Sequence, residues 1–108
     1  MLSALDTVDL VVTTPTGEKK LVLVVEEGEW ERDDRLFLLQ EKLNAYAIFA
    51  LDGEMYERYP GSQGVPVTII IEAAQIPADL EFFVRRVTPV LAKDHLALEA
   101  KQAPERSA

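Results

Sequence analysis

The side chains of this chain that could do chemistry are concentrated in one short acidic segment. Six carboxylates stand within residues 26–34, and the only tryptophan, Trp30, lies among them. Clustered carboxylate oxygens suit Mg²⁺ or Ca²⁺, but the spacing matches no EF-hand loop and Arg32 interrupts it. We therefore expect a solvated loop that leads into a helix, with no bound metal and no cofactor.

Three residues of this segment are candidates for a binding surface. Asp33 and Asp34 precede a helical pattern, so either carboxylate could cap the helix by accepting a backbone N–H. Trp30 could pack over the helix start or anchor a protein contact. If the flanking strands are parallel, the segment lies at their carboxyl ends, where ligands usually bind. The carboxylates there favour a cationic group over a phosphate.

The sequence predicts no catalytic site. It contains no cysteine and a single histidine, His95, and no nucleophile or carboxylate stands in a recognisable pattern with it. Ser62 lies between glycines in the loop 60–65 but lacks the lysine of a phosphate-binding loop. The absence of cysteine also excludes disulfides and thiolate metal ligands. The sequence does not exclude an enzymatic activity, but it favours a protein that is not an enzyme.

Hydrophobic periodicity predicts the elements that must position these residues. A turn at 15–18 joins the first two strands, an extra helical turn falls at 54–59, and Pro89 should kink or end the second helix near Thr88. The elements follow the order ββαβαβ: strands over 7–14 and 19–26, a helix over 35–52, a strand over 67–74, a helix from Pro77, and a strand over 95–101.

This order predicts an α+β fold, a two-layer sandwich with a four-stranded mixed sheet and two helices on one face. The first two strands form an antiparallel hairpin, and each strand–helix–strand step joins parallel strands by a right-handed crossover. The crossovers leave the strand order open. We expect one domain over residues 1–102 and a disordered tail over 103–108, which is small, polar and contains proline.

Charge and hydropathy exclude several partners. The net charge is −8, with 19 acidic against 11 basic side chains, so the chain repels nucleic acids and anionic membrane surfaces. A basic protein partner is compatible with this charge. The first ten residues contain no basic region, and no apolar run is long enough to cross a bilayer, so we expect a cytoplasmic protein.

The chain contains more large apolar residues than one sheet face and one helix stripe require. The first helix should face the core with a stripe that includes Leu36 and Leu39, leaving Leu38 and Phe49 roughly opposite. Phe37, Ile48 and Leu51 fall to one side of that stripe. On the strands, the side chains that should point away from the helices are Val11, Val22, Val24 and Ile70.

Surplus apolar surface of this kind marks protein interfaces. Gln40 and Asn44 stand four residues apart on the first helix, so they share a face and could hydrogen-bond across an interface. Two-fold homodimers are the commonest soluble assembly. The alternative is that irregular segments, the tail or another helix cover the surplus.

The segment around the first helix resembles a family of small bacterial proteins of about this length. A tryptophan with acidic residues at 30–34 precedes the sequence LLQEKLNAY at 38–46. Gly-Glu-Met-Tyr follows at 53–56, and Tyr-Pro at 59–60. The family carries an LLLQEKxNxY-like helix, and Phe37 replaces the first leucine of that form. The resemblance covers nearly the whole chain, implies a single domain, and carries no activity over to these residues.

Three functional hypotheses remain. The first is a non-enzymatic interaction module that forms a homodimer through the apolar sheet face or the first helix. The second is an acidic immunity or inhibitor protein that neutralises a basic protein through residues 26–34. The third is a small-molecule or metal site at the carboxyl ends of the strands.

Overall fold

The computed structural model describes residues 2, 8–26, 28–52, 54–59 and 65–103. The expected tail beyond residue 103 and Ser62, with most of its loop, lie outside this part of the chain. The elements run in the order β1 (Leu10–Thr13), β2 (Lys19–Val25), the short 3-10 helix η1 (Glu29–Glu31), α1 (Arg35–Leu51), α2 (Glu54–Arg58), β3 (Val67–Ala73), α3 (Ala78–Ala92) and β4 (Leu96–Gln102).

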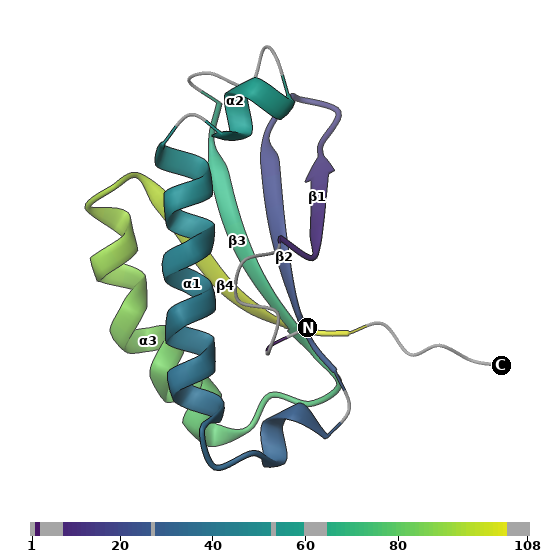
Figure 1. Ribbon diagram of the computed structural model, residues 1–108, viewed down its shortest axis with the longest axis vertical. Coiled ribbons are helices and arrows are strands. Elements are labelled where there is room, and N and C mark those ends of the chain that lie inside the picture. Colours follow the sequence, from purple (N-terminus) through teal and green to yellow (C-terminus); the bar gives the residue numbers. More distant parts are fainter. Residues whose placement is uncertain (1, 3–7, 27, 53, 60–64, 104–108) are drawn as a thin grey trace, which may run out of the picture.

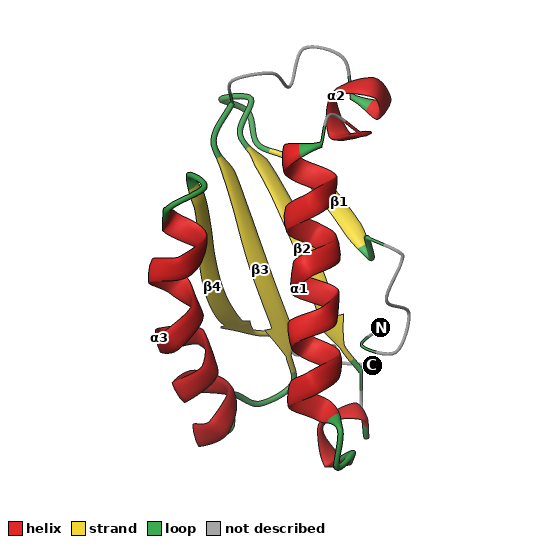
Figure 2. Ribbon diagram, turned by 60° about the vertical axis from the view of Figure 1, so that its left-hand side comes forward, coloured by secondary structure: helices red, strands yellow, loops and turns green. Residues whose placement is uncertain are grey.

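The four strands form one mixed sheet in the order β1-β2-β3-β4. β1 pairs with β2 antiparallel, and the other two pairs are parallel. Both crossovers advance in the same direction across the sheet, so right-handed connections place α1 and α3 on the same face. Figures 1 and 2 show the two helices side by side over that face, with α2 at one end. The predicted two-layer α+β sandwich is confirmed.

The core lies between the sheet and the helices. The side chains that fill it from β2 and β3 are wholly buried: Leu21, Leu23, Ile69 and Ile71. Val11 is opposite Leu21 in the ladder and packs against this core, so the expectation that it points away from the helices is wrong. Residues directly opposite in a ladder share a face, and Leu10 and Val12 take the outer face instead.

Val22, Val24 and Ile70 do point away from the helices, as the alternation predicts. Val22 and Ile70 are nonetheless only 5% exposed. They stand in one cross-strand row with Leu10, and large neighbours in such a row cover one another. Much of this outer apolar surface is therefore already in contact within the sheet.

α1 is rotated about its axis relative to the predicted stripe. Leu38 and Phe49 are 8% and 5% exposed, whereas Leu36, expected in the core, is 38% exposed. A segment far away in the sequence contributes to the same core. Leu2 lies in one hydrophobic cluster with Leu38 and Phe49, and Val8 packs against that cluster.

The end of α3 and the start of β4 differ from what the sequence predicts. Pro89 lies inside α3, which continues to Ala92. A proline in the last turn removes one hydrogen bond there, and only a few residues follow it in the helix. His95, expected to begin the last strand, instead adopts a left-handed φ of 62° in the turn before β4.

The turn between β1 and β2 depends on a glycine. Gly17 has φ of 90° and donates its N–H to the Thr14 carbonyl at 2.9 Å. A side-chain carbon placed at Gly17 would meet nothing within 4 Å, so a substitution acts only through backbone strain.

We predict that Gly17→Ala lowers the free energy of unfolding by about 1 kcal/mol, measured by urea denaturation. Gly17→Asn should lose less, because asparagine tolerates this conformation. Equal stability of all three proteins would contradict the prediction.

Candidate functional site

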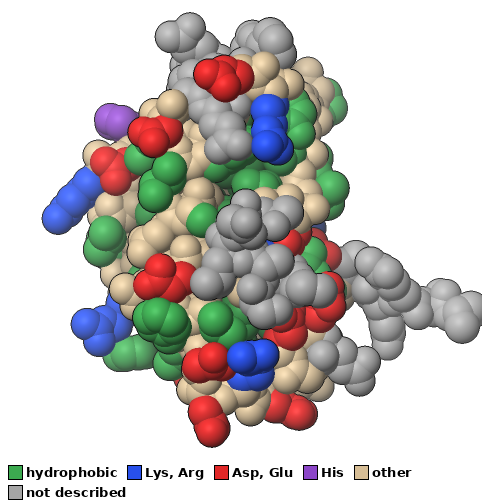
Figure 3. Space-filling view, viewed as in Figure 1, with side chains coloured by type: hydrophobic (Ala, Val, Ile, Leu, Met, Phe, Trp, Pro, Cys, Tyr) green, Lys and Arg blue, Asp and Glu red, His purple; other side chains and the backbone are tan. Residues whose placement is uncertain are grey.

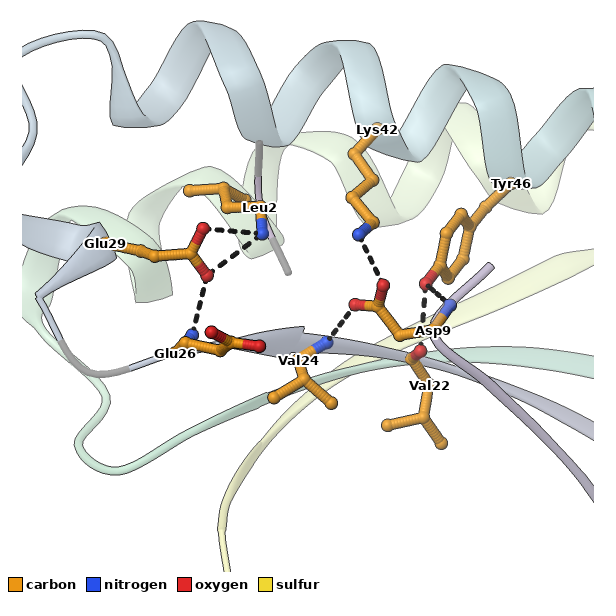
Figure 4. A network of polar contacts seen from close by, with 8 residues as sticks. All are labelled: Leu2, Asp9, Val22, Val24, Glu26, Glu29, Lys42 and Tyr46. Carbon is orange, nitrogen blue, oxygen red and sulfur yellow. Dashed lines mark hydrogen bonds and ion pairs between the residues drawn. The ribbon is translucent and has the colours of Figure 1, made fainter. Parts of the chain in front are cut away.

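A buried ion pair joins α1 to the segment before β1. Lys42 is completely buried, and its Nζ lies 2.6 Å from Asp9 Oδ1 (Figure 4). The second oxygen, Asp9 Oδ2, accepts the backbone N–H of Val24 at 2.9 Å. One carboxylate thus offsets the charge of a buried ammonium group and binds β2 just beyond the end of its ladder with β1.

Tyr46, one turn after Lys42, completes this network. Its hydroxyl group accepts the backbone N–H of Asp9 at 2.8 Å and donates to the carbonyl of Val22 at 2.9 Å (Figure 4). The phenol therefore takes the place of a direct ladder bond between the two strands. Burial raises the pKa of Tyr46, so the hydroxyl keeps the proton that it donates.

A second carboxylate holds the start of the chain. The Leu2 backbone N–H donates to both oxygens of Glu29, at 3.0 and 2.9 Å, and the Glu26 N–H donates to Glu29 Oε1 at 2.8 Å. Figure 4 shows Leu2 between this carboxylate and α1. Glu29 is therefore engaged within the chain, although it belongs to the acidic segment.

The charged residues of α1 lie away from its outer face. Lys42 points to Asp9, Arg35 binds Asp79 at 3.0 Å, and Glu41 is half-buried. Every exposed residue of α1 is uncharged. We name these residues the α1 outer face: Leu36, Phe37, Gln40, Asn44, Ile48 and Leu51.

A groove continues the α1 outer face toward α3. It has a volume of about 510 Å³, and Gln40 and Asn44 lie in its α1 wall with Leu36. The α3 wall includes Phe82 and Val90, which are 61% and 57% exposed. The remaining lining residues are Asp79, Phe83, Arg86 and Val87. Figure 3 shows hydrophobic side chains over α1 and α3 with charged side chains around them.

Trp30 joins the acidic segment to the starts of α1 and α3. The ring N–H of the half-buried Trp30 donates to Asp79 Oδ1 at 3.0 Å, and the Arg35 guanidinium lies 5.9 Å from the centre of the Trp30 ring. Burial alone would raise the pKa of Asp79, but the hydrogen bonds from Trp30, Arg35 and the Leu80 N–H outweigh it and lower the pKa. Within the fold, the Trp30 ring thus packs at the start of α1, which is one of the two roles considered from the sequence.

The capping role expected of Asp33 or Asp34 is wrong in its side-chain detail. Asp34 stands at the N-cap position of α1, but its carboxylate makes no hydrogen bond to the first turn. The carboxylate instead accepts two bonds from Arg32, at 2.9 and 3.2 Å, and these lower its pKa. Arginine competes with the helix N–H groups because charged hydrogen bonds are the stronger ones. Asp33 is exposed.

The predicted site residues divide into three places. Trp30, Asp33 and Asp34 lie beside the carboxyl ends of β2 and β3, where a shallow hollow of about 380 Å³ includes Trp30. Gln40 and Asn44 lie in the helix groove. The outer sheet face holds Val22, Val24 and Ile70.

Two further findings concern metal ions and membranes. Within the described part of the chain, no three His, Asp or Glu side chains gather as metal ligands would. No helix found there has the length and apolar character needed to cross a membrane.

Sequence reasoning missed the Asp9–Lys42–Tyr46 network. Asp9 and Lys42 are 33 positions apart, so no local pattern connects them. The available signal was the spacing of Lys42 and Tyr46, which stand four residues apart and therefore share a helix face. Tyr46 is a large aromatic residue of the kind that packs in a core, and a lysine on the same face requires a buried counter-charge.

A family model covers both the network and the helix face. The model of DUF6572, a family of unknown function, matches residues 1–103. The chain belongs to DUF6572. Membership confirms the expected place in a family of unknown function, and the DUF6572 match includes all residues of the groove. Searches of the curated proteins and of the solved structures found no match.

The ion pair makes the free energy of unfolding depend on pH, in a direction that follows from the pKa of Asp9. Burial raises the pKa of Asp9, but hydrogen bonds from Lys42 and the Val24 N–H outweigh this effect, so folding lowers it. The stabilisation is therefore complete above the unfolded pKa of about 3.9 and is lost as the pH falls through the lower folded value.

We predict that Asp9→Asn lowers the free energy of unfolding by about 3 kcal/mol at pH 7, because buried Lys42 loses its counter-charge. The difference from the native protein should shrink below pH 4. Urea denaturation across this pH range measures both effects. Asp94→Asn, at an exposed turn, is the control and should be neutral. A difference that stays constant down to pH 2 would exclude the assigned role of Asp9.

Proposed function

We propose that this DUF6572 member is a non-enzymatic, cytoplasmic protein-interaction module that associates with a second copy through the α1 outer face. The observation that carries the proposal is the uncharged character of that face over all its exposed positions. A helix that faces water normally presents charged and polar residues on its outer side. The three charged residues of α1 instead lie in buried or half-buried positions.

The order of residues on this face suits contact with a second copy. Leu36, Gln40, Asn44 and Ile48 form a ridge at four-residue spacing, apolar at both ends with amides in the middle. Ridges of this spacing interdigitate in the commonest class of helix packing. In an antiparallel contact about a two-fold axis that passes between Gln40 and Asn44, Gln40 lies opposite Asn44 of the partner and Leu36 opposite Ile48. The ridge reads apolar, amide, amide, apolar from either end, as a self-complementary contact requires.

The amides suit the centre of such a contact. A charged residue near a two-fold axis approaches its own copy and is repelled, whereas an amide group both donates and accepts hydrogen bonds. Gln40 and Asn44 can therefore bond across the axis, as the sequence hypothesis supposed. Burial of these amides is favourable only when their hydrogen bonds are made, so they fix the register of the contact.

The apolar area is of the right size. Six side chains of α1 and α3 are between 38% and 61% exposed. Together they offer roughly 600 Å², if a large apolar side chain has about 200 Å² in total. The two amides add to this area, and a standard interface buries about 800 Å² on each partner. The six side chains are Leu36, Phe37, Ile48, Leu51, Phe82 and Val90.

The other two surfaces have weaker support. The outer sheet face exposes Leu10 and Val12, while its central valine and isoleucine are already covered. In the acidic segment, Glu29 binds backbone N–H groups and Asp34 binds Arg32, so part of its charge is offset within the chain. The outer sheet face enters the tests below as the alternative interface.

We predict that Ile48→Glu lowers the mass of the assembly at a given concentration, because it places a charge in the contact. A residue near the centre of an interface typically contributes 2 kcal/mol or more, or about a thirtyfold change in the association constant. Sedimentation or light scattering over a concentration series measures the change. Ile48 is 58% exposed, so the fold should tolerate the substitution.

The matched control is Leu10→Glu on the outer sheet face, where Leu10 is 51% exposed. It should leave the mass unchanged. If only Leu10→Glu lowers the mass, the sheet face is the interface. A native protein that stays monomeric near millimolar concentration would exclude self-association.

A charge pair tests the register of the proposed contact. Asn44→Glu alone should weaken association at least about tenfold, because two carboxylates approach the axis. Gln40→Lys combined with Asn44→Glu should restore most of it, because each lysine lies opposite a glutamate of the partner. The same concentration series measures both variants. No recovery in the double variant would refute the antiparallel register.

A further inference from the structure

β4 forms one edge of the sheet that the described residues build. It has seven residues and lies last in the strand order, with no described strand beyond it. The edge strand contains no proline, and its register with β3 runs without interruption from Leu96 to Gln102. Regular, accessible edges of this kind can pair with another strand.

The hydrogen-bonding groups of β4 alternate between the two sides. Ala103 donates its N–H to the carbonyl of Ala73 at 2.7 Å, so the odd-numbered residues bond toward β3. The backbone groups of the even-numbered residues therefore point outward, and no partner for them occurs among the described residues. These residues are Leu96, Leu98, Ala100 and Gln102.

The opposite edge of the sheet, formed by β1, is protected against pairing, in contrast to the β4 edge. β1 has only four residues, and very short strands are one way in which proteins protect sheet edges. Beyond β1, the Asp9 carboxylate binds the Val24 N–H and Tyr46 binds the Val22 carbonyl. No comparable contact covers β4 among the residues described.

The charges on β4 favour the self-pairing register that places Glu99 opposite Lys101. Glu99 and Lys101 are exposed on the face opposite the helices. In an antiparallel pair of β4 strands centred on Ala100, Glu99 lies opposite Lys101 of the partner, twice about the axis. A pair centred on Glu99 or Lys101 places like charges directly opposite, which is unfavourable. Only small side chains meet at the Ala100 axis.

The alternation of backbone groups agrees with this register. Ala100 points its N–H and carbonyl outward, so two copies can exchange both bonds across the axis. The charged pairs then occupy the non-hydrogen-bonded positions, where Cα atoms are about 4.5 Å apart and side chains are closest. Backbone geometry and charge thus favour the same pairing.

We propose that the β4 edge pairs antiparallel with β4 of a second copy, centred on Ala100, to form a continuous eight-stranded sheet. The two-fold axis is perpendicular to the sheet, so the helices of both copies lie on the same face. The edge contact uses residues of β4 and none of the α1 outer face. The edge contact is therefore independent of the proposed helix contact, and the two together extend the assembly beyond a dimer.

Cysteine cross-linking tests the register, because the native chain has no cysteine. Full-length chains carrying Glu99→Cys are mixed with chains carrying Lys101→Cys and are oxidised mildly. Opposite positions in this register meet the Cα separation that a disulfide requires. We expect the mixture to form cross-linked dimers at least about tenfold more efficiently than either variant alone.

A second mixture measures cross-linking from other registers and from random collision. Ala97→Cys with Lys101→Cys should give little product, since these positions are opposite only in a pair centred on Glu99. If that mixture, or Glu99→Cys alone, gives the main product, the proposed register is wrong. Equal, low yields from all combinations would overturn the edge pairing itself.

Charge reversal provides a measurement without oxidation. In an Ile48→Glu background, Glu99→Lys should weaken the remaining dimer about tenfold, because like charges then face each other twice. Glu99→Lys with Lys101→Glu should restore it. No effect of either change would overturn the charge-selected register. The cross-links report only on β4, so failure of the helix contact and failure of the edge contact give different results.

Discussion

The arrangement of this molecule depends on the buried ion pair between Lys42 and Asp9. A completely buried ammonium group is costly unless a carboxylate and further hydrogen bonds offset its charge. Asp9 offers that carboxylate and also binds β2, while Tyr46 bridges the two strands from the next turn of α1. The ion pair therefore fixes the rotation of α1 about its axis. That rotation decides which side chains of the helix meet water.

The uncharged outer face of α1 is the counterpart of this rotation. The helix contains Arg35, Glu41 and Lys42, and the fold uses the first and last of them in contacts with Asp79 and Asp9. A helix that commits its charges inward has only amides and large apolar groups left for its surface. The internal polar network and the proposed interface are thus two results of one distribution of residues along α1.

The sequence predicted the elements well because their periodicity is local. The bounds of α1 and of β3 agree within one residue, and the two-layer arrangement follows from the ββαβαβ order. The burial of Leu38 and Phe49 could not be predicted in this way, because the core that they join includes Leu2 and is lined by Val8, which are remote in the chain. The same holds for Asp9, whose partner is 33 residues away. That Gln40 and Asn44 share one helix face could be predicted, because their spacing is itself local.

The closure of one sheet edge limits what kind of object the chain can form. Where β1 ends, a carboxylate and a phenol already occupy the groups of β2 that an incoming strand would need. A strand can therefore be added readily on one side of the sheet and not on the other. A sheet that can extend in only one direction stops growing once two copies have met. The network thus limits the addition of strands at the β1 edge, a property that depends on geometry and does not require extra surface charge.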